Sequence, residues 1–322
     1  MKKTILAMAV PALLAAGSAS ASINLYDAEG VKVDASGAAE VQYIQDIGNN
    51  QDGKWRLDDG DFAINTEVAV SDKLSVIGAM AFEFENLKAD SNDLENRGDV
   101  ENDELYVGFK GDWGQFTAGR QYLLMDDSGI TKDYELSVNS FGVDINQAAQ
   151  VGKYVYDNGS FYGAVTYTDY SEGDDTTDDQ TIYEGRLGYR IADVDARVYY
   201  QLAEDLGRVS DADTEAYNFE IEYAGIENVG IAASYGRTTD KTGATDVDTD
   251  YVSLAADYTM GKTTFGVGYD NQDADGTSTD LNGYYANVTY ALHSNAHVYA
   301  ELGDSDGDEQ DFGYVAGMEV KF

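Results

Sequence analysis

The sequence predicts an all-β fold, a 16-stranded antiparallel β-barrel that crosses a membrane. Apolar and polar residues alternate with a period of two in many segments. Short turns alternate with long acidic connections, and an export signal precedes a chain that contains no cysteine. A period of two places successive side chains on opposite faces of a strand, so it indicates strands and not helices.

The first segment indicates export. Met1, Lys2 and Lys3 form a positive start, an apolar run follows up to Gly17, and residues 19–21 read Ala-Ser-Ala. This order is typical of a secretory signal peptide, and it predicts cleavage before Ser22. The apolar run is shorter than the roughly 20 residues that a membrane-spanning helix needs. We therefore expect a signal peptide at residues 1–21 and a single barrel domain at residues 22–322.

Charge and composition exclude several classes of protein. The chain has 20 basic and 60 acidic residues, and its net charge of −40 becomes −42 when Lys2 and Lys3 are removed. Nucleic acid is excluded as a partner because its phosphates require a basic surface. The lack of a long apolar run after the signal excludes a helical membrane protein. A soluble exported β protein and a barrel in the outer membrane both remain open at this point.

The alternation is clearest at the C-terminal end. One face there carries Phe312, Tyr314, Ala316, Met318, Val320 and Phe322, and the other carries Asp311, Gly313, Gly317, Glu319 and Lys321. Residues 183–191, 194–202 and 217–223 alternate in the same way. Aromatic residues are frequent at the edges of the apolar faces, as at Tyr167, Tyr189, Tyr223, Tyr258, Tyr269 and Tyr290. Such rings suit the two interfaces of a bilayer, which favours the outer-membrane barrel.

The connections alternate in length. Seven short turns are predicted near residues 71–73, 111–114, 157–160, 192–194, 225–228, 259–262 and 292–295. Eight long connections are predicted near residues 48–53, 88–99, 122–147, 171–179, 205–213, 239–248, 271–279 and 304–310. Outer-membrane barrels have short periplasmic turns, long external loops and an even number of strands, which agrees with the 16 strands that these connections delimit.

The run from Glu104 to Tyr122, ELYVGFKGDWGQFTAGRQY, resembles the hairpin of the fourth and fifth strands in the trimeric general porins of Gram-negative bacteria. The number of hairpins and the terminal Phe322 agree with this resemblance, which covers the whole chain. Length and acidity are most similar to the OmpU-like porins of marine bacteria. The resemblance implies a homotrimer in a membrane that contains lipopolysaccharide, with residues 88–99 reaching a neighbouring subunit. It also implies that the strand ending at Phe322 is recognised by the barrel assembly machinery.

The same resemblance implies that the third loop, about residues 122–147, folds into the barrel as a constriction. Its carboxylates are Asp126, Asp127, Asp133 and Glu135, and the basic residues expected opposite them are Arg56, Arg120 and Lys153. Opposed charges would orient polar solutes and exclude apolar ones. A further arginine of the family is replaced here by acidic Asp103 or Glu104, which favours cations. The family's Pro-Glu-Phe turn is absent, so the path of the loop stays open, and without the resemblance its carboxylates would be solvated charges.

Arg186, Arg190 and Arg197 lie on the polar faces of adjacent predicted strands. They could form a basic ladder along the lumen that guides anions. They could instead pair with Glu184, Asp195 and Glu220 and stiffen the wall, and we favour these pairs because lumenal charges of a barrel commonly face one another.

No catalytic, cofactor or metal site is predicted. The two histidines, His293 and His297, flank a predicted periplasmic turn, and the adjacent Ser294 would point to the opposite face from His293. No nucleophile, base and orienting group come together in the sequence. Residues 271–276 resemble the start of a calcium loop, but Asn282 stands where the closing glutamate is needed.

The leading hypothesis is a channel for passive diffusion of ions and small hydrophilic solutes across the outer membrane, with a weak preference for cations. It depends on the polar lumenal faces, the long third loop and the negative charge. The alternative is an adhesion or structural barrel whose acidic loops bind host or lipid partners. The small lumenal residues Gly108, Gly188, Gly313 and Gly317 argue against the plugged interior that this alternative requires.

Overall fold

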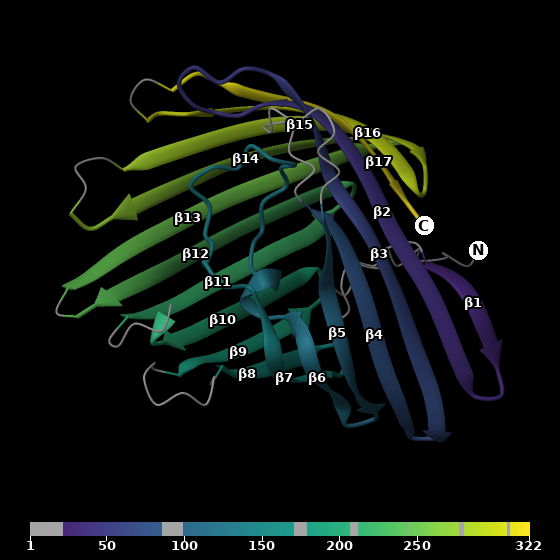
Figure 1. The fold of residues 1–322 in the computed structure, drawn as a ribbon. Coiled ribbons are helices and arrows are strands. Elements are labelled where there is room, and N and C mark those ends of the chain that lie inside the picture. The colour runs from purple at the N-terminus through teal and green to yellow at the C-terminus, as the bar shows by residue number, and fades with distance from the viewer. Residues whose placement is uncertain are drawn as a thin grey trace.

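The computed structural model describes residues 22–85, 99–170, 179–206, 212–243, 245–276, 280–307 and 310–322 (Figure 1). The predicted signal peptide, and residues 88–98 of the predicted subunit-contact loop, lie outside these ranges.

The described residues form one sheet of 17 strands. The first eight are β1 (Ser22–Ala28), β2 (Val31–Gln45), β3 (Lys54–Ser71), β4 (Leu74–Glu85), β5 (Asp99–Gly111), β6 (Gly114–Tyr122), β7 (Gln147–Asp157) and β8 (Phe161–Tyr170). The others are β9 (Gln180–Ile191), β10 (Val194–Glu204), β11 (Ala212–Ile226), β12 (Val229–Thr242), β13 (Thr245–Met260), β14 (Thr263–Ala274), β15 (Leu281–His293), β16 (Ala296–Ser305) and β17 (Gly313–Lys321).

The barrel closes at β2, which has two partners on one edge. Residues 38–45 of β2 pair with β17, and residues 31–36 pair with β1. Gly37 and Phe322 exchange backbone hydrogen bonds of 2.8 and 2.9 Å, and Ser22 pairs with Ser36, the next residue of β2. β1 therefore continues the line of β17, and the two strands together fill one position of the ring. The predicted 16-stranded antiparallel barrel is confirmed.

Antiparallel order puts the turn after β1 and after every second strand from there at one end of the barrel, and the other connections at the opposite end. One short turn that was not predicted is formed by Glu29 and Gly30 between β1 and β2. Both residues have positive φ angles, 55° and 77°. A left-handed conformation of this kind is easy for glycine and matches the twist of a tight hairpin.

The long connection predicted at residues 239–248 is wrong. β12 continues to Thr242, which pairs with Thr245 at the start of β13, and Gly243 adopts a φ of 62° in the turn between them. Asp248, one of the acidic residues that suggested a loop, accepts hydrogen bonds from Thr239 at 2.7 Å and from Arg237 at 3.1 Å. Cross-strand pairs of this kind stabilise a hairpin, and threonine favours strands.

The faces of the strands agree with the predicted alternation. In β9, Leu187 and Tyr189 are 57% and 51% exposed on the outer face, whereas Glu184 and Arg186 are 5% and 2% exposed and point inward. The predicted aromatic positions Tyr167, Tyr223, Tyr258 and Tyr290 are exposed on the outer face as well. Among the described residues, no helix is both long and apolar enough to cross a membrane.

The third loop, residues 123–146, crosses the inside of the barrel between β6 and β7 (Figure 1). Leu136 of this loop packs in a buried cluster with Ile44 and Val315. Two wall glycines make room for the loop, because a Cβ on Gly303 would lie 2.5 Å from the Cβ of Leu136, and one on Gly236 would lie 2.3 Å from the Phe141 ring. The predicted inward fold of the third loop is confirmed.

Candidate functional site

Three buried glutamates of the barrel wall hold the third loop by its backbone. Glu184 of β9, Glu220 of β11 and Glu301 of β16 are 5%, 3% and 1% exposed. Each accepts hydrogen bonds that backbone N–H groups of the loop donate. A buried N–H without an acceptor costs about 1–3 kcal/mol, so these carboxylates determine the path of the loop. Glu301 was not predicted as a site residue, although its place on the polar face of a strand is a signal that the sequence carries.

Glu301 accepts three consecutive backbone N–H groups. Tyr134 donates at 2.8 Å, Glu135 at 2.9 Å and Leu136 at 2.7 Å. The side-chain amide of Asn287 donates to the same carboxylate at 3.0 Å. Hydrogen bonds to an ionised acceptor are roughly twice as strong as neutral ones, so this attachment fixes the middle of the loop firmly.

Glu184 and Glu220 hold the first part of the loop. The N–H groups of Leu124 and Met125, where the short 3-10 helix η1 (Met125–Asp127) begins, donate to Glu184 at 2.5 and 3.0 Å. The N–H of Gly129 donates to Glu220 at 2.6 Å. The loop is therefore fixed to two wall carboxylates before it reaches Glu301.

Asp127, one of the predicted loop carboxylates, pairs with Arg186. The Asp127 Oδ2 lies 2.5 Å from Nη1 of Arg186. The guanidinium lies over the rings of Tyr162 and Tyr199, at 5.8 and 5.7 Å from their centroids. Glu184, one of the three acidic residues expected to pair with the lumenal arginines, binds the backbone of the loop instead.

Glu135 and Arg56 are in direct contact. The Glu135 Oε2 lies 2.6 Å from Nη2 of Arg56, and the same nitrogen lies 2.7 Å from Asp58. The amide of Gln42 joins the group, since it donates to Glu135 at 2.9 Å and accepts from Arg56 at 2.6 Å. The structure thus brings together Glu135 and Arg56, an acid and a base that the resemblance selected, and Asp58 shares the same guanidinium group.

Asp126 and Asp133 have local neutral partners. Asn146 donates its side-chain amide to Asp126 at 2.9 Å, and the N–H of Ser137 donates to Asp133 at 3.0 Å. Neither carboxylate forms an ion pair with any basic residue in the part of the chain that the structure describes.

Arg120 and Lys153 lie at the root of the loop. Arg120 donates to the backbone oxygens of Asn102 and Asp103 at 2.6 and 3.0 Å, and to the side chain of Gln147. Lys153 donates to the backbone oxygen of Tyr122 at 3.0 Å. A cavity of about 50 Å³ at this root is lined by Lys153, Glu104, Asp126 and Asp127, among others. The partners of these two basic residues differ from those of Arg56, so the three cations do not act on one common group.

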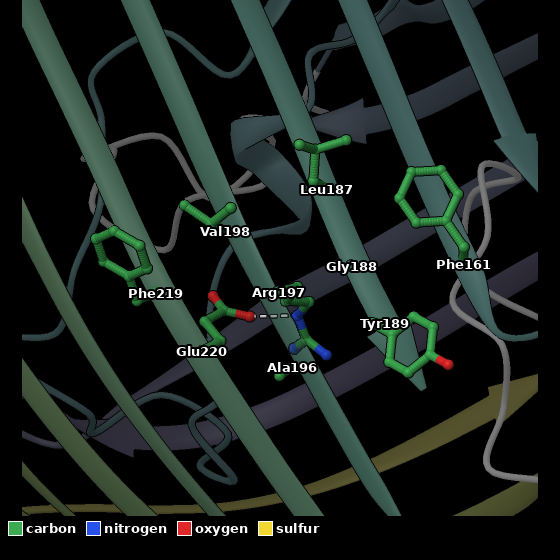
Figure 2. Close-up of a pocket in the computed structure, with 9 residues that line it drawn as sticks. All are labelled: Phe161, Leu187, Gly188, Tyr189, Ala196, Arg197, Val198, Phe219 and Glu220. Carbon is green, nitrogen blue, oxygen red and sulfur yellow. Dashed lines mark hydrogen bonds and ion pairs between the residues drawn. The ribbon is translucent and has the colours of Figure 1, made fainter. Parts of the chain in front are cut away.

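The other two lumenal arginines have carboxylate partners. Arg190 lies 3.2 Å from Asp195 and 2.8 Å from Asp157. Arg197 pairs with Glu220, as the dashed line in Figure 2 shows, and lies 2.7 Å from Glu222. Asp195 and Glu220, two of the three acidic partners expected for these arginines, are thus paired with Arg190 and Arg197. Figure 2 also shows apolar side chains of the outer face, which line a groove of about 380 Å³. The groove is lined by Phe161, Leu187, Tyr189, Ala196, Val198 and Phe219, together with Arg197 and Glu220.

A closed barrel with an inward third loop and paired lumenal charges is the architecture of a pore. The family model described as Gram-negative porin matches residues 6–310. The chain belongs to the Gram-negative porin family. This porin is 48% identical to porin-like protein H of Photobacterium profundum, and the match covers 100% of both chains.

Solved structures share the fold of this porin. The trimer form of OmpT from Vibrio cholerae matches with a TM-score of 0.74 at 20% identity, over 91% of this chain and 100% of that one. An anion-selective porin from Comamonas acidovorans also matches with a TM-score of 0.74, at 12% identity and with the same coverage. Family and fold make this porin a diffusion channel of the Gram-negative outer membrane, as predicted.

Proposed function

We propose that this porin is a weakly cation-selective general diffusion channel for ions and small hydrophilic solutes. The observation that carries the proposal is the pairing of lumenal arginines. Arg56, Arg186 and Arg197 each contact a carboxylate, whereas Asp126 and Asp133 have no described basic partner. Excess negative charge in a narrow, low-dielectric passage raises the local concentration of cations.

In this proposal Asp126, Asp127, Asp133 and Glu135 form the acidic side of the constriction, and Arg56, Arg120 and Lys153 the basic side. The contact between Glu135 and Arg56 supports it. Asp103, Glu104, Arg186, Arg190 and Arg197 belong to the surrounding lumenal wall. Asp103 accepts a hydrogen bond from Gln147 at 2.7 Å at the end of the loop, which supports a role at its root.

The test is the conductance and reversal potential of the purified porin in a planar bilayer under a salt gradient. Stepwise conductance with a reversal potential that favours cations is expected. An anion-favouring or zero reversal potential would contradict the selectivity. A correctly folded protein that shows no conductance would favour the adhesion or structural barrel instead.

The selectivity should depend on pH through Asp126. Burial in the third loop, and next the charge of Asp127, raise the pKa of Asp126 to about 6. The group is then mostly ionised at about pH 7.5 and mostly protonated at about pH 5. We expect the loss of this carboxylate charge to lower the cation-to-anion permeability ratio about twofold over this range. Asp126→Asn should lower the ratio at pH 7.5 and reduce its pH dependence, and an unaltered pH profile in this variant would contradict the assignment.

We also propose that the porin assembles as a homotrimer in a membrane containing lipopolysaccharide, and that the barrel assembly machinery recognises the strand ending at Phe322. The match to the trimer form of OmpT supports the assembly. Three near-equal conductance steps in the bilayer experiment would agree with a trimer, and single independent steps would contradict it.

Processing before Ser22 is part of the same proposal. Its support is the order of residues 1–21, a positive start, an apolar run and Ala-Ser-Ala directly before Ser22. The intact mass of porin purified from outer membranes should correspond to residues 22–322. A mass that retains any of residues 1–21 would contradict this cleavage site.

A further inference from the structure

The groove on the outer face of the barrel lies over β8 to β11 and has a volume of about 380 Å³. Ala196 of β10 pairs in register with Tyr189 of β9 and with Ile221 of β11. A single methyl group between two large side chains leaves a hollow in the apolar surface. Large apolar side chains form the rest of the lining, namely Phe161, Leu187, Val198 and Phe219 (Figure 2).

The groove lies near the end of the barrel that carries the short turns. Phe161 is the first residue of β8, and Ala196 is the third of β10. Tyr189 and Tyr223, close to the ends of β9 and β11, are exposed on the outer face, and tyrosines of this kind mark the edge of a bilayer. Because the short turns of outer-membrane barrels are periplasmic, the groove faces the lipids of the periplasmic leaflet.

Packing favours an acyl chain in this groove. The hydrophobic effect alone does not bring a lipid there, because lipid tails are as apolar as leucine. The atoms that line an unfilled hollow lose dispersion contacts, however, and a gap of about 0.5–1 Å already forfeits a quarter to a half of each contact. A long, flexible acyl chain follows the shape of such a hollow and restores these contacts.

Carboxylates stand at the turns beside the groove. Asp193, between β9 and β10, and Glu227, between β11 and β12, are both exposed. The turn segments 157–160, 192–194 and 225–228 contain no basic residue. Carboxylates at the level of the lipid head groups attract an ammonium group and repel an anionic head group.

Two arginines of this part of the wall are bound by lumenal carboxylates. Arg197 lines the groove, but it pairs with Glu220 and lies 2.7 Å from Glu222. Arg190 forms ion pairs of 2.8 and 3.2 Å with two aspartates of the wall. Neither guanidinium group is therefore available for the phosphate of a lipid, and an anionic lipid gains no basic partner from them.

A second copy of the chain is the other occupant to consider. The resemblance to the trimeric general porins implies a subunit contact at residues 88–99, which follow β4 and lead into β5. The groove over β8 to β11 belongs to a different part of the wall. Its position and the charges beside it thus favour lipid over a neighbouring subunit.

We infer that this groove binds an acyl chain of a phospholipid from the periplasmic leaflet, and that Asp193 and Glu227 select a lipid whose head group carries an ammonium group, as in phosphatidylethanolamine. The acyl chain lies over Ala196, and the head group lies at the level of the turns. The site is separate from the diffusion path, because it is on the opposite face of the wall from the lumen.

The experiment measures the lipid that remains on folded, delipidated porin by native mass spectrometry. Phosphatidylethanolamine and phosphatidylglycerol with identical acyl chains are added in equal amounts. The wild type should retain one lipid per chain, and phosphatidylethanolamine should exceed phosphatidylglycerol about threefold, as expected for one exposed ion pair.

Three variants separate the acyl chain from the head group. Ala196→Leu fills the hollow and should lower the retention of both lipids about fivefold, because the chain loses its contacts. Ala286→Leu, the same change on the exposed outer face of β15, should bind as the wild type does. Asp193→Asn with Glu227→Gln should keep the lipid but bring the ratio of the two lipids to about one. Ala196→Val serves if Ala196→Leu does not fold, which heat-modifiable gel mobility reports.

Each outcome decides one part of the inference. Equal lipid retention in the wild type and in Ala196→Leu overturns the site for the acyl chain. A lipid ratio that stays at the wild-type value in the double turn variant overturns the selection by the two carboxylates. The chain has no cysteine, so Ala196→Cys introduces a unique thiol that should stay unlinked in native membranes. Disulfide-linked pairs of this variant would show that a second copy covers the groove, which overturns the inference as a whole.

Discussion

Replacing Glu301 by glutamine should loosen the third loop and widen the channel. The glutamine side chain keeps one acceptor oxygen and presents an NH₂ group to the three N–H donors of Tyr134, Glu135 and Leu136. Each lost hydrogen bond to the carboxylate costs about 1.5–3 kcal/mol, so the attached loop should lose on the order of 3–6 kcal/mol. We expect a larger and noisier single-channel conductance, and faster liposome swelling with sugars that pass slowly through the wild type.

The matched control is Glu215→Gln. Glu215 also lies on a strand of the barrel, but its side chain is 40% exposed and lies 3.8 Å from Lys241, away from the loop. The same chemical change there should leave conductance and noise unaltered. A Glu301→Gln channel that matches the wild type in both would show that the loop is held by its apolar packing and not by the glutamate.

Asp127→Asn should destabilise the root of the loop. Arg186 is 2% exposed, and the substitution removes the carboxylate at 2.5 Å that compensates its charge. Removing one partner of a buried ion pair typically costs about 3–5 kcal/mol because the other charge stays buried. We expect loss of the compact, heat-modifiable form at a lower temperature than in the wild type, followed by gel mobility after graded heating.

The double variant Asp127→Asn with Arg186→Met tests the cause. It removes the buried charge together with its partner, so it should recover most of the stability that Asp127→Asn loses. Additive losses in the two single variants and the double variant would mean that Asp127 acts through the local geometry of η1 and not through Arg186.

The fold could be predicted because the outer face of the barrel contacts lipid, whereas the inner face contacts water. Leu187 and Tyr189 outside and Arg186 inside follow from the period of two without any knowledge of neighbours. The same dependence on apolar alternation explains why the hairpin around Gly243 was predicted to be a loop. A hairpin that is polar on both faces has no apolar alternation, and its aspartates resemble those of a loop until their cross-strand partners are known.

The site could be predicted only in part. The resemblance selected Glu135 and Arg56, which the structure brings together. Periodicity places Glu301 on an inner face, but a glutamate there looks the same whether it binds a cation, an arginine or a backbone. The partners of Glu301 depend on the path of the third loop. The length of this loop and its apolar residues do not determine that path. The pairing of Arg186 with Asp127 of the loop could not be predicted for the same reason.

The attachment of the loop to Glu301 also bears on the order in which the channel forms. Glu301 comes 165 residues after Leu136, on the last strand but one of the barrel. Contacts between residues so far apart in sequence form late, because the chain between them must first be ordered. The third loop is synthesised in the first half of the chain, yet its backbone amides find their acceptor only when the final strands are in place. A barrel on its way to closure therefore passes through a stage with a wide lumen, and the narrow passage that sorts solutes is completed last.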